Sequence, residues 1–264
     1  MTSGVVTLTT DFGLRDSFVG AMKGVLLSRC PSLQIVDLCH EVPPQDVLAG
    51  ALRLAAAAPF YPPGTVHVAV VDPGVGSTRR PIAIQAAGQV FVGPDNGVLS
   101  LAAHRAAAGW QAVVLDRPEL WLPEVSHTFH GRDVFAPTAA YLACGGALAE
   151  VGTDIDDVVE IALPRVQPEG DGLRGAVIDV DHFGNLITNI QRVDLGDRVV
   201  QTVSLGGATI EKLSSFYDPA EPLVAVISSE GRLEVAVPGG NAALELGLAV
   251  GAVVDIDLRP LPCV

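Results

Sequence analysis

The hydrophobic positions change their spacing along the chain, and this spacing predicts the structural elements. In the first part, short apolar runs such as 5–10 and 66–71 alternate with longer segments, 17–28 and 46–58. The apolar runs are typical of strands buried on both faces of a sheet. The longer segments begin with Ser or Asp, which cap helices, and end close to a proline. We therefore predict an α/β domain with a mostly parallel sheet over residues 1–163.

The pattern changes at residues 164–172, which are rich in proline and glycine and predict a linker. Beyond it, the second predicted domain spans residues 173–264. Its short apolar runs are 174–181, 186–190, 199–204, 223–228, 233–237 and 252–258. Short strands split by turns favour a small C-terminal β-barrel. The glycine pairs at 206–207 and 239–240 are consistent with hairpin turns.

Composition narrows the classes of function. The formal charge of −14, with only two lysines, argues against binding to nucleic acid or to an anionic membrane. No run approaches the roughly 18 apolar residues of a membrane helix, and Asp11 comes too early for a signal peptide, so we expect a cytoplasmic protein. The cysteines have no CxxC spacing, which indicates neither a zinc site nor a disulfide framework. They are Cys30, Cys39, Cys144 and Cys263.

Four polar clusters stand out in this apolar chain. They are residues 10–17, 72–80, 130–133 and 181–185. The first two follow predicted strands, and the third precedes a predicted helix, so all three can converge on one edge of the sheet. Open α/β sheets bind ligands at the carboxyl ends of their strands. No Gly-x-Gly-x-x-Gly motif, Walker loop or Gly-x-Ser-x-Gly motif is present, which excludes the commonest sites of this fold class.

Five motifs occur in a fixed order. They are Thr-Thr-Asp-Phe-Gly (9–13), Val-Asp-Pro-Gly-Val-Gly-Ser-Thr-Arg-Arg (71–80), Gly-Pro-Asp-Asn-Gly (93–97), Thr-Phe-His-Gly-Arg-Asp (128–133) and Asp-His-Phe-Gly-Asn-Leu-Ile-Thr-Asn-Ile (181–190). Together they span almost the whole chain. They resemble the S-adenosylmethionine (SAM) hydroxide adenosyltransferase family, whose relatives are the SAM-dependent fluorinating and chlorinating enzymes.

The resemblance implies an N-terminal α/β domain and a C-terminal β-barrel. It also implies a homotrimer that binds SAM between the N-terminal domain of one subunit and the C-terminal domain of its neighbour. The implied reaction converts SAM and water to adenosine and L-methionine. SAM is the substrate, and neither a metal nor another cofactor is expected.

The same resemblance assigns roles to single residues. Asp72, Arg79 and His130 match the family's water-activating set, and Asp11 matches the acid that binds the ribose hydroxyls. The other implied substrate contacts are Ser17 near the methionine end, Asp181 and Asn185 at the methionine ammonium and carboxylate, Ser229 as a further methionine contact, and Asn241 and Ala242 at adenine.

Alternatives remain at several of these positions. A SAM-dependent halogenase is the nearest one, but the halogenases carry tyrosine at the position of Asp72, so water is the expected nucleophile. A non-catalytic sensor of SAM or adenosine is the other, and the complete set of Asp72, Arg79 and His130 weighs against it. Either Asp72 or His130 could take the proton from water, and Arg80 could replace Arg79. For Arg132 and Asp133 we predict an internal ion pair or charges at the start of a helix, rather than a catalytic role.

Overall fold

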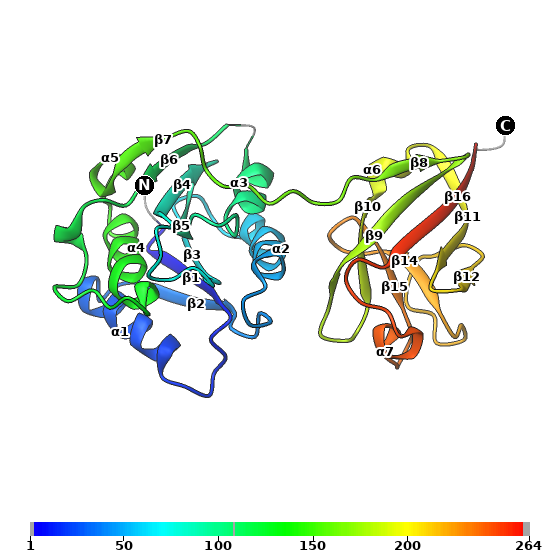
Figure 1. The fold of residues 1–264 in the computed structure, drawn as a ribbon, viewed down its shortest axis with the longest axis horizontal. Helices are drawn as coiled ribbons and strands as arrows, with labels where there is room; N and C mark the ends of the chain where they lie inside the picture. Colours follow the sequence, from blue (N-terminus) through cyan, green and yellow to red (C-terminus); the bar gives the residue numbers. More distant parts are fainter. Residues whose placement is uncertain (1–2, 108, 261–264) are drawn as a thin grey trace. The chain divides into compact units, whose positions relative to one another are not determined.

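The structure is a computed structural model that describes residues 3–107 and 109–260. The chain divides into two compact units, Met1–Ile161 and Ala162–Val264. Each unit has its own sheet and its own hydrophobic core (Figure 1).

A seven-stranded sheet with the order β2-β1-β3-β5-β4-β6-β7 lies at the centre of the N-terminal unit. Its strands are β1 (Val5–Thr10), β2 (Gln34–Cys39), β3 (Val66–Val70), β4 (Pro81–Ala86), β5 (Gln89–Pro94), β6 (Gln111–Val114) and β7 (Thr153–Ile155). The pairs β1–β2, β1–β3 and β3–β5 are parallel, whereas β4–β5, β4–β6 and β6–β7 are antiparallel.

The prediction of a mostly parallel sheet therefore needs correction, because the sheet is mixed. The cause is the hairpin of β4 and β5, and the short apolar runs 82–85 and 90–92 do predict a hairpin at this place. Its turn uses Ala87 and Gly88, both with positive φ, and it places β4 between two strands of the opposite direction. A hairpin strand inserted in this way makes antiparallel pairs on both of its sides.

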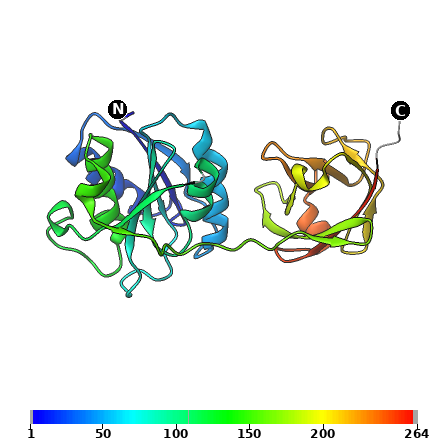
Figure 2. The same cartoon turned by 90° about the horizontal axis from the view of Figure 1, so that it is seen from above.

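Helices cover both faces of this sheet (Figures 1 and 2). They are α1 (Phe18–Arg29), α2 (Val47–Ala57), α3 (Ser100–Ala106), α4 (Ala136–Ala143) and α5 (Leu148–Val151), with short turns η1 (Ala58–Phe60), η2 (Pro118–Leu120) and the π-helical η3 (Gly131–Phe135). Alternate residues of β3 serve the two faces: Val68 and Val70 pack in the core of α1 and α4, whereas Ala69 packs in the core of α2 and α3. The continuous apolar run of β3 follows from burial on both faces.

Two details of this unit differ from expectation. The sequence predicts a short helix over about 99–108, whereas α3 ends at Ala106, and Ala108 lies outside the described residues. Cys30 and Cys144 form a disulfide that joins the C-terminal ends of α1 and α4. The spacing of the cysteines could not indicate it, because 114 positions separate the two residues along the chain. Cys39 is free, and Cys263 lies outside the described residues.

The C-terminal unit is built on a second, largely antiparallel sheet with the order β12-β11-β16-β9-β10-β15-β14-β13, and β8 also pairs with β9. Its strands are β8 (Gln167–Glu169), β9 (Gly172–Val180), β10 (Leu186–Gln191), β11 (Arg198–Leu205), β12 (Ala208–Ile210), β13 (Leu213–Ser214), β14 (Val224–Ile227), β15 (Arg232–Ala236) and β16 (Val253–Pro260). The sheet curls around its core and is nearly barrel-shaped (Figure 2).

All six predicted strands of this unit are present. The glycine pair 206–207 forms the predicted hairpin between β11 and β12. The pair 239–240 does not: it leads into the short helix α7 (Ala242–Leu246) rather than into a strand. Asn241 caps α7, because its side chain accepts a hydrogen bond from Leu244 N. A second short helix, α6 (Arg192–Leu195), follows β10.

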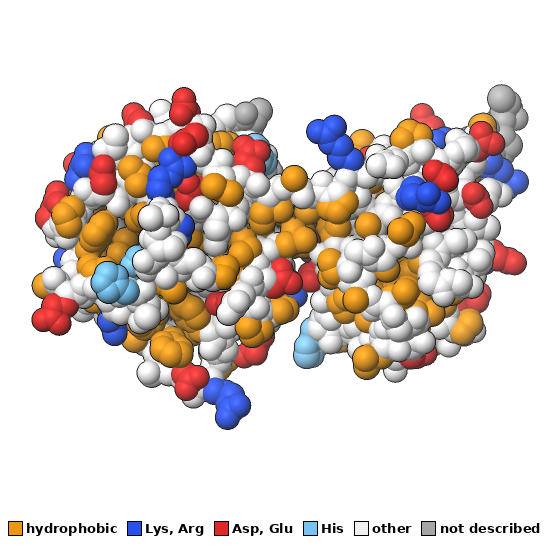
Figure 3. Space-filling model, viewed as in Figure 1, with side chains coloured by type: hydrophobic (Ala, Val, Ile, Leu, Met, Phe, Trp, Pro, Cys, Tyr) orange, Lys and Arg blue, Asp and Glu red, His pale blue; other side chains and the backbone are white. Residues whose placement is uncertain are grey.

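Charged side chains are spread over the face shown in Figure 3, where both acidic and basic groups lie on each unit and the acidic groups are more numerous. This distribution agrees with the formal charge of −14. Among the described residues, no helix is long and apolar enough to cross a bilayer.

Candidate active site

The turn between β3 and β4 brings Asp72 and Arg79 together. The Arg79 Nε lies 3.0 Å from both carboxylate oxygens of Asp72, and its Nη2 also donates to Oδ2. Both side chains are largely buried, with exposed fractions of 9% for Arg79 and 5% for Asp72. The guanidinium carbon lies 5.3 Å from the centre of the Phe135 ring, so Arg79 contacts both an aromatic ring and a carboxylate.

His130 completes this cluster. Its Nδ1 lies 2.8 Å from Arg79 Nη2. A guanidinium has only donors, so Nδ1 must accept, and the neutral ring then carries its proton on Nε2. Burial, and after it the charge of Arg79, lowers the pKa of His130 below its ordinary value. His130 is therefore a neutral donor through Nε2 at neutral pH. Arg79 Nη1 is buried and has no hydrogen-bond partner among the described residues.

Gly76 allows the Asp72 turn to pack against the segment before His130. Its φ is 76°, and a Cβ at this position would lie 2.3 Å from the carbonyl oxygen of His127. Only glycine combines such a φ with such a close approach to backbone. The turn is further closed by Ser77, whose hydroxyl donates to Gly74 O and accepts from Arg79 N.

The Gly-Pro-Asp-Asn-Gly motif at the end of β5 supports both ends of this turn. Asn96 Nδ2 donates to the carbonyl of Val71 at 2.8 Å, immediately before Asp72. Asp95 accepts from Arg80 Nε at 2.8 Å, immediately after Arg79. Arg80 also bonds Asp157. Arg80 is therefore engaged away from Asp72, which favours Arg79 as the arginine of the site.

The π-helical turn η3 places His130 at its start. The predicted pair of Arg132 and Asp133 is present, with Nε 2.6 Å from Oδ1. Asp133 is completely buried and also accepts from Ser126 N at 2.9 Å. It thereby holds the segment before His130 against η3. Asp133 is a structural anchor, as the sequence indicated.

Asp11 follows β1 at the same edge of the sheet, because the parallel register of β1 and β3 pairs Thr10 with Val70. Its Oδ2 accepts from Gln45 N at 2.8 Å. Gln45 has a φ of 66°, an unusual conformation for a residue other than glycine. Such strain is often found at functional sites, and here it turns an amide towards a carboxylate. The sequence contained no signal for this contact.

Three phenylalanine rings connect the Asp11 segment with the His130 segment. The ring of Phe129 lies 5.8 Å from that of Phe12 and 5.4 Å from that of Phe18, in edge-to-face geometry. Phe12 and Phe129 are half-buried, and Phe18 is exposed. Ser17 is exposed at the start of α1 and makes no capping hydrogen bond with its side chain. The three N-terminal clusters thus converge as expected, although the role of each residue stays a prediction.

In the C-terminal unit, Asp181 and Asn185 lie in the turn between β9 and β10. Asp181 Oδ1 accepts from Phe183 N and Asn185 N, at 2.9 and 2.8 Å, and Oδ2 accepts from Asn185 Nδ2 at 3.0 Å. The two side chains therefore form one polar pair, held by its own turn.

The segment of Asn241 and Ala242 packs against this turn. Ala243 N donates to Gly184 O at 3.0 Å, and a Cβ on Gly184 would lie 2.1 Å from the amide carbon of Asn241. Ser229 lies elsewhere, in the turn between β14 and β15. The register pairs Gln191, the last residue of β10, with Arg232, so Ser229 is near the end of β10 remote from Asn185.

Glu234 and Tyr217 form a hydrogen-bonded pair in the C-terminal unit that the sequence did not indicate. Glu234 on β15 is 4% exposed, and its Oε1 accepts from the Tyr217 hydroxyl at 2.7 Å. Burial raises the pKa of Glu234, and the nearby charge of Asp181 adds to this effect. Burial also raises the pKa of Tyr217 to about 12, with a further contribution from Glu234. A glutamate within an alternating strand pattern gave no sign of this burial.

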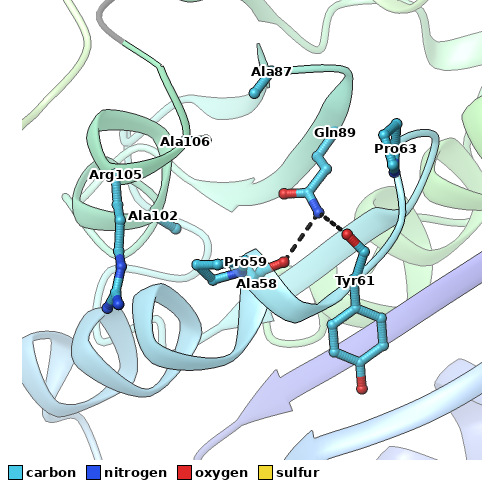
Figure 4. A pocket seen from close by; sticks show the side chains of 9 residues that line it. All are labelled: Ala58, Pro59, Tyr61, Pro63, Ala87, Gln89, Ala102, Arg105 and Ala106. Carbon is cyan, nitrogen blue, oxygen red and sulfur yellow. Dashed lines mark hydrogen bonds between the residues drawn. The ribbon is translucent and has the colours of Figure 1, made fainter. Parts of the chain in front are cut away.

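A cavity of about 330 Å³ lies in the N-terminal unit, away from these residues (Figure 4). Gln89, the first residue of β5, lies on its wall and donates from Nε2 to the carbonyls of Ala58 and Tyr61 at 3.0 and 2.9 Å. Asp72 follows the end of β3, which is parallel to β5. The cavity therefore lies at the opposite edge of the sheet. Within residues 3–107 and 109–260, no group of three or more His, Cys, Asp or Glu side chains is arranged to hold a metal.

Comparison with known proteins covers both units. Residues 6–152 match the family described as the SAM hydroxide adenosyltransferase N-terminal domain, and residues 175–255 match the corresponding C-terminal domain. An (R)-S-adenosyl-L-methionine hydrolase from Salinispora tropica is 44% identical over 251 residues, which cover 93% of this chain and 95% of that protein.

More distant and structural matches agree. A fluorinase from Nocardia brasiliensis is 29% identical over 292 residues, with 96% of this chain and 97% of that protein covered. The crystal structure of an uncharacterized conserved protein from Thermotoga maritima superimposes with a TM-score of 0.87 at 35% identity, covering 96% of this chain and 99% of the other.

Proposed function

The chain belongs to the SAM hydroxide adenosyltransferase family, and we propose that it hydrolyses SAM to adenosine and L-methionine. Relatives that are 35–44% identical over at least 90% of this chain are named (R)-S-adenosyl-L-methionine hydrolases. The observation within this chain that supports the proposal most directly is the contact of Arg79 with both Asp72 and His130.

The proposed chemistry is displacement at C5′ of SAM by water, with methionine as the leaving group. Free water is a poor nucleophile, with a pKa near 15.7. We assign Asp72 as the group that takes the proton, because Arg79 occupies His130 Nδ1 and leaves only a donor on Nε2. Among the described residues, Asp72 Oδ1 accepts one hydrogen bond, from Arg79 Nε, and so has a lone pair for that proton. His130 and Arg79 then stabilise the developing hydroxide by donation.

Substrate binding divides between the two units in this proposal. Asp11 binds the ribose hydroxyls and Ser17 lies near the methionine end. In the C-terminal unit, Asp181 and Asn185 bind the methionine ammonium and carboxylate, with Ser229 as a further methionine contact, and Asn241 and Ala242 contact adenine. The polar pair of Asp181 and Asn185 supports this assignment, because a bound ammonium needs a carboxylate that is already in place. SAM is the substrate, and no further cofactor takes part.

A homotrimer with SAM at its subunit boundaries is part of the proposal and rests on the motif resemblance. A cytoplasmic location is the other part of the proposal. The Cys30–Cys144 disulfide bears on it, because cytosolic proteins usually keep such pairs as thiols. Alkylation of thiols in fresh cell extract, followed by mass spectrometry, distinguishes the two states.

A single experiment distinguishes SAM hydrolysis from the two alternatives, a SAM-dependent halogenase and a non-catalytic sensor. The purified protein is incubated with SAM in ¹⁸O-labelled water and 1 M chloride, and the products are separated by chromatography and weighed by mass spectrometry. Hydrolysis gives adenosine with label at the 5′-oxygen. A halogenase gives 5′-chloro-5′-deoxyadenosine instead, and a sensor leaves SAM intact. Either of these last two results would overturn the proposed function.

A further inference from the structure

A buried hydrogen-bonded pair lies directly behind Asp11. Thr10 Oγ1 and His40 Nδ1 are 2.8 Å apart. Thr10 is completely buried and His40 is 4% exposed. The proposed chemistry uses neither side chain. Burying the polar nitrogens of a histidine ring costs free energy unless they have hydrogen-bond partners, and Thr10 supplies one.

The direction of the hydrogen bonds in this pair can be assigned. Phe12 N donates to Thr10 Oγ1 at 3.2 Å. The Thr10 hydroxyl hydrogen is then free to donate to His40 Nδ1, which leaves the ring proton on Nε2. His40 Nε2 lies 3.0 Å from Asp37 Oδ1, but it is not aligned as a hydrogen bond. The contact is electrostatic, and Asp37 is also paired with Lys23 at 2.6 Å.

The backbone of the His40 segment binds the same loop. Gly13 N donates to His40 O at 2.8 Å, and Val42 N lies 3.4 Å from Thr10 O. Further along this segment, Gln45 N donates to Asp11 Oδ2. The residues on both sides of Asp11 and its own carboxylate are therefore held by residues 40–45. Within the described part of the chain, no group donates a hydrogen bond to Asp11 Oδ1, so this oxygen can accept from a ligand.

We propose that His40 is a positioning residue for nucleoside recognition, acting through Thr10 and the Phe12 amide to hold Asp11 against the ribose hydroxyls. This inference rests on the proposed function, since it takes the adenosyl group as the ligand. His40 would set how strongly the site prefers a ribonucleoside to a deoxyribonucleoside. A histidine that only fills the core would affect all ligands through stability instead.

The test compares binding of adenosine, 2′-deoxyadenosine, 3′-deoxyadenosine and L-methionine by calorimetry. His40→Leu removes the acceptor of the Thr10 hydroxyl, whereas His40→Asn keeps an acceptor close to the place of Nδ1. Thr10→Val removes the hydroxyl itself. Its matched control is Thr9→Val on the same strand, because the buried Thr9 hydroxyl has no hydrogen-bond partner among the described residues. Circular dichroism and thermal unfolding confirm that each variant is folded.

In the wild-type protein, we expect adenosine to bind roughly 10- to 100-fold more tightly than the weaker of the two deoxynucleosides, as for a hydrogen bond to a charged group. Thr9→Val and His40→Asn should keep this ratio. His40→Leu and Thr10→Val should reduce it to within about threefold, with methionine affinity unchanged within about twofold. Should His40→Leu not fold, Thr10→Val alone decides.

The contrary results are distinct. A ratio unchanged in folded His40→Leu or Thr10→Val overturns the inference, as does a parallel loss of adenosine and methionine affinity. Equal binding of all three nucleosides to a wild-type protein that hydrolyses SAM shows that Asp11 does not select the ribose, and the inference fails while the proposed function stands. A wild-type protein that neither binds adenosine nor hydrolyses SAM overturns both.

Discussion

Replacement of Asp72 by asparagine tests the centre of the proposed mechanism. The variant keeps the shape of the side chain but removes its charge and basicity. It also places an NH₂ group where one carboxylate oxygen now accepts from Arg79, so that two donors face one another. Arg79 remains 9% exposed with no compensating carboxylate. The change therefore affects both catalysis and stability.

The expected magnitudes follow from this burial. Removing one partner of a buried ion pair costs about 3–5 kcal/mol, and we expect the lower end because the remaining amide oxygen still accepts. Loss of a positioned base lowers the rate about 10²-fold or more, which corresponds to at least about 2.7 kcal/mol of transition-state stabilisation. Adding Arg79→Met to Asp72→Asn removes both charges, so the double variant should be more stable than the sum of the single changes implies.

Urea denaturation measures the free energy of unfolding of the wild type, both single variants and the double variant. SAM turnover is followed by chromatography at a temperature at which each protein is folded. Wild-type turnover in folded Asp72→Asn would show that Asp72 does not take the proton. The same conclusion would follow if the activity of Asp72→Asn fell only in proportion to its folded fraction. Additive stability changes in the double variant would show that Asp72 and Arg79 do not act as a pair.

Three further predictions concern other parts of the molecule. Gly76→Ala should lower the melting temperature and the turnover, because the new methyl group meets His127 O and φ is 76°. Gly109→Ala is the control and should lower neither, because a Cβ there meets nothing within 4 Å. Equal effects of the two changes would contradict the packing described. Asp181→Ala should weaken L-methionine binding by on the order of 2–5 kcal/mol in calorimetry, with the exposed Asp171→Ala as control; unchanged affinity would remove Asp181 from the site. Burial lowers the pKa of His67 from 6.5 to about 4, so its neutral form contributes stability that is fully present above pH 6.5 and is lost as the pH falls towards 4. This difference corresponds to roughly 3 kcal/mol, and His67→Gln should lose correspondingly less stability over that range in urea denaturation at stepped pH; parallel pH profiles would contradict it.

Sequence patterns predicted those helices and strands whose type follows from the pattern of buried residues alone. The run at β3 is apolar because both of its faces are covered, and the spacing of the C-terminal runs is that of exposed turns between short strands. The direction of the strands was harder to predict from the sequence, because a buried strand has the same composition whether its neighbours are parallel or antiparallel. The hairpin of β4 and β5 was recognised, but its consequence for β6 and β7 was not drawn.

The candidate site shows the same division. The cluster of Asp72, Arg79 and His130 could be anticipated, because the motifs that contain these residues resemble those of a known family. Its supports could not. Gln45 contributes a backbone amide through an unusual φ, and Asn96 contributes a side chain to a carbonyl 25 residues earlier. Backbone groups have no identity in a sequence, and long-range pairing follows only from the assembled sheet.

Asp95 links the turn that carries Arg79 with the segment that leaves the N-terminal unit. One oxygen binds Arg80, next to Arg79, and the other accepts from Val159 N at 2.8 Å, in the segment by which the chain leaves the N-terminal unit. Asp157 in the same segment binds Arg80 as well. A fragment ended at Gly152, where the family match stops, would lack both of these contacts. The compact N-terminal unit therefore extends to Ile161, and the exit segment is as much a part of its architecture as the sheet.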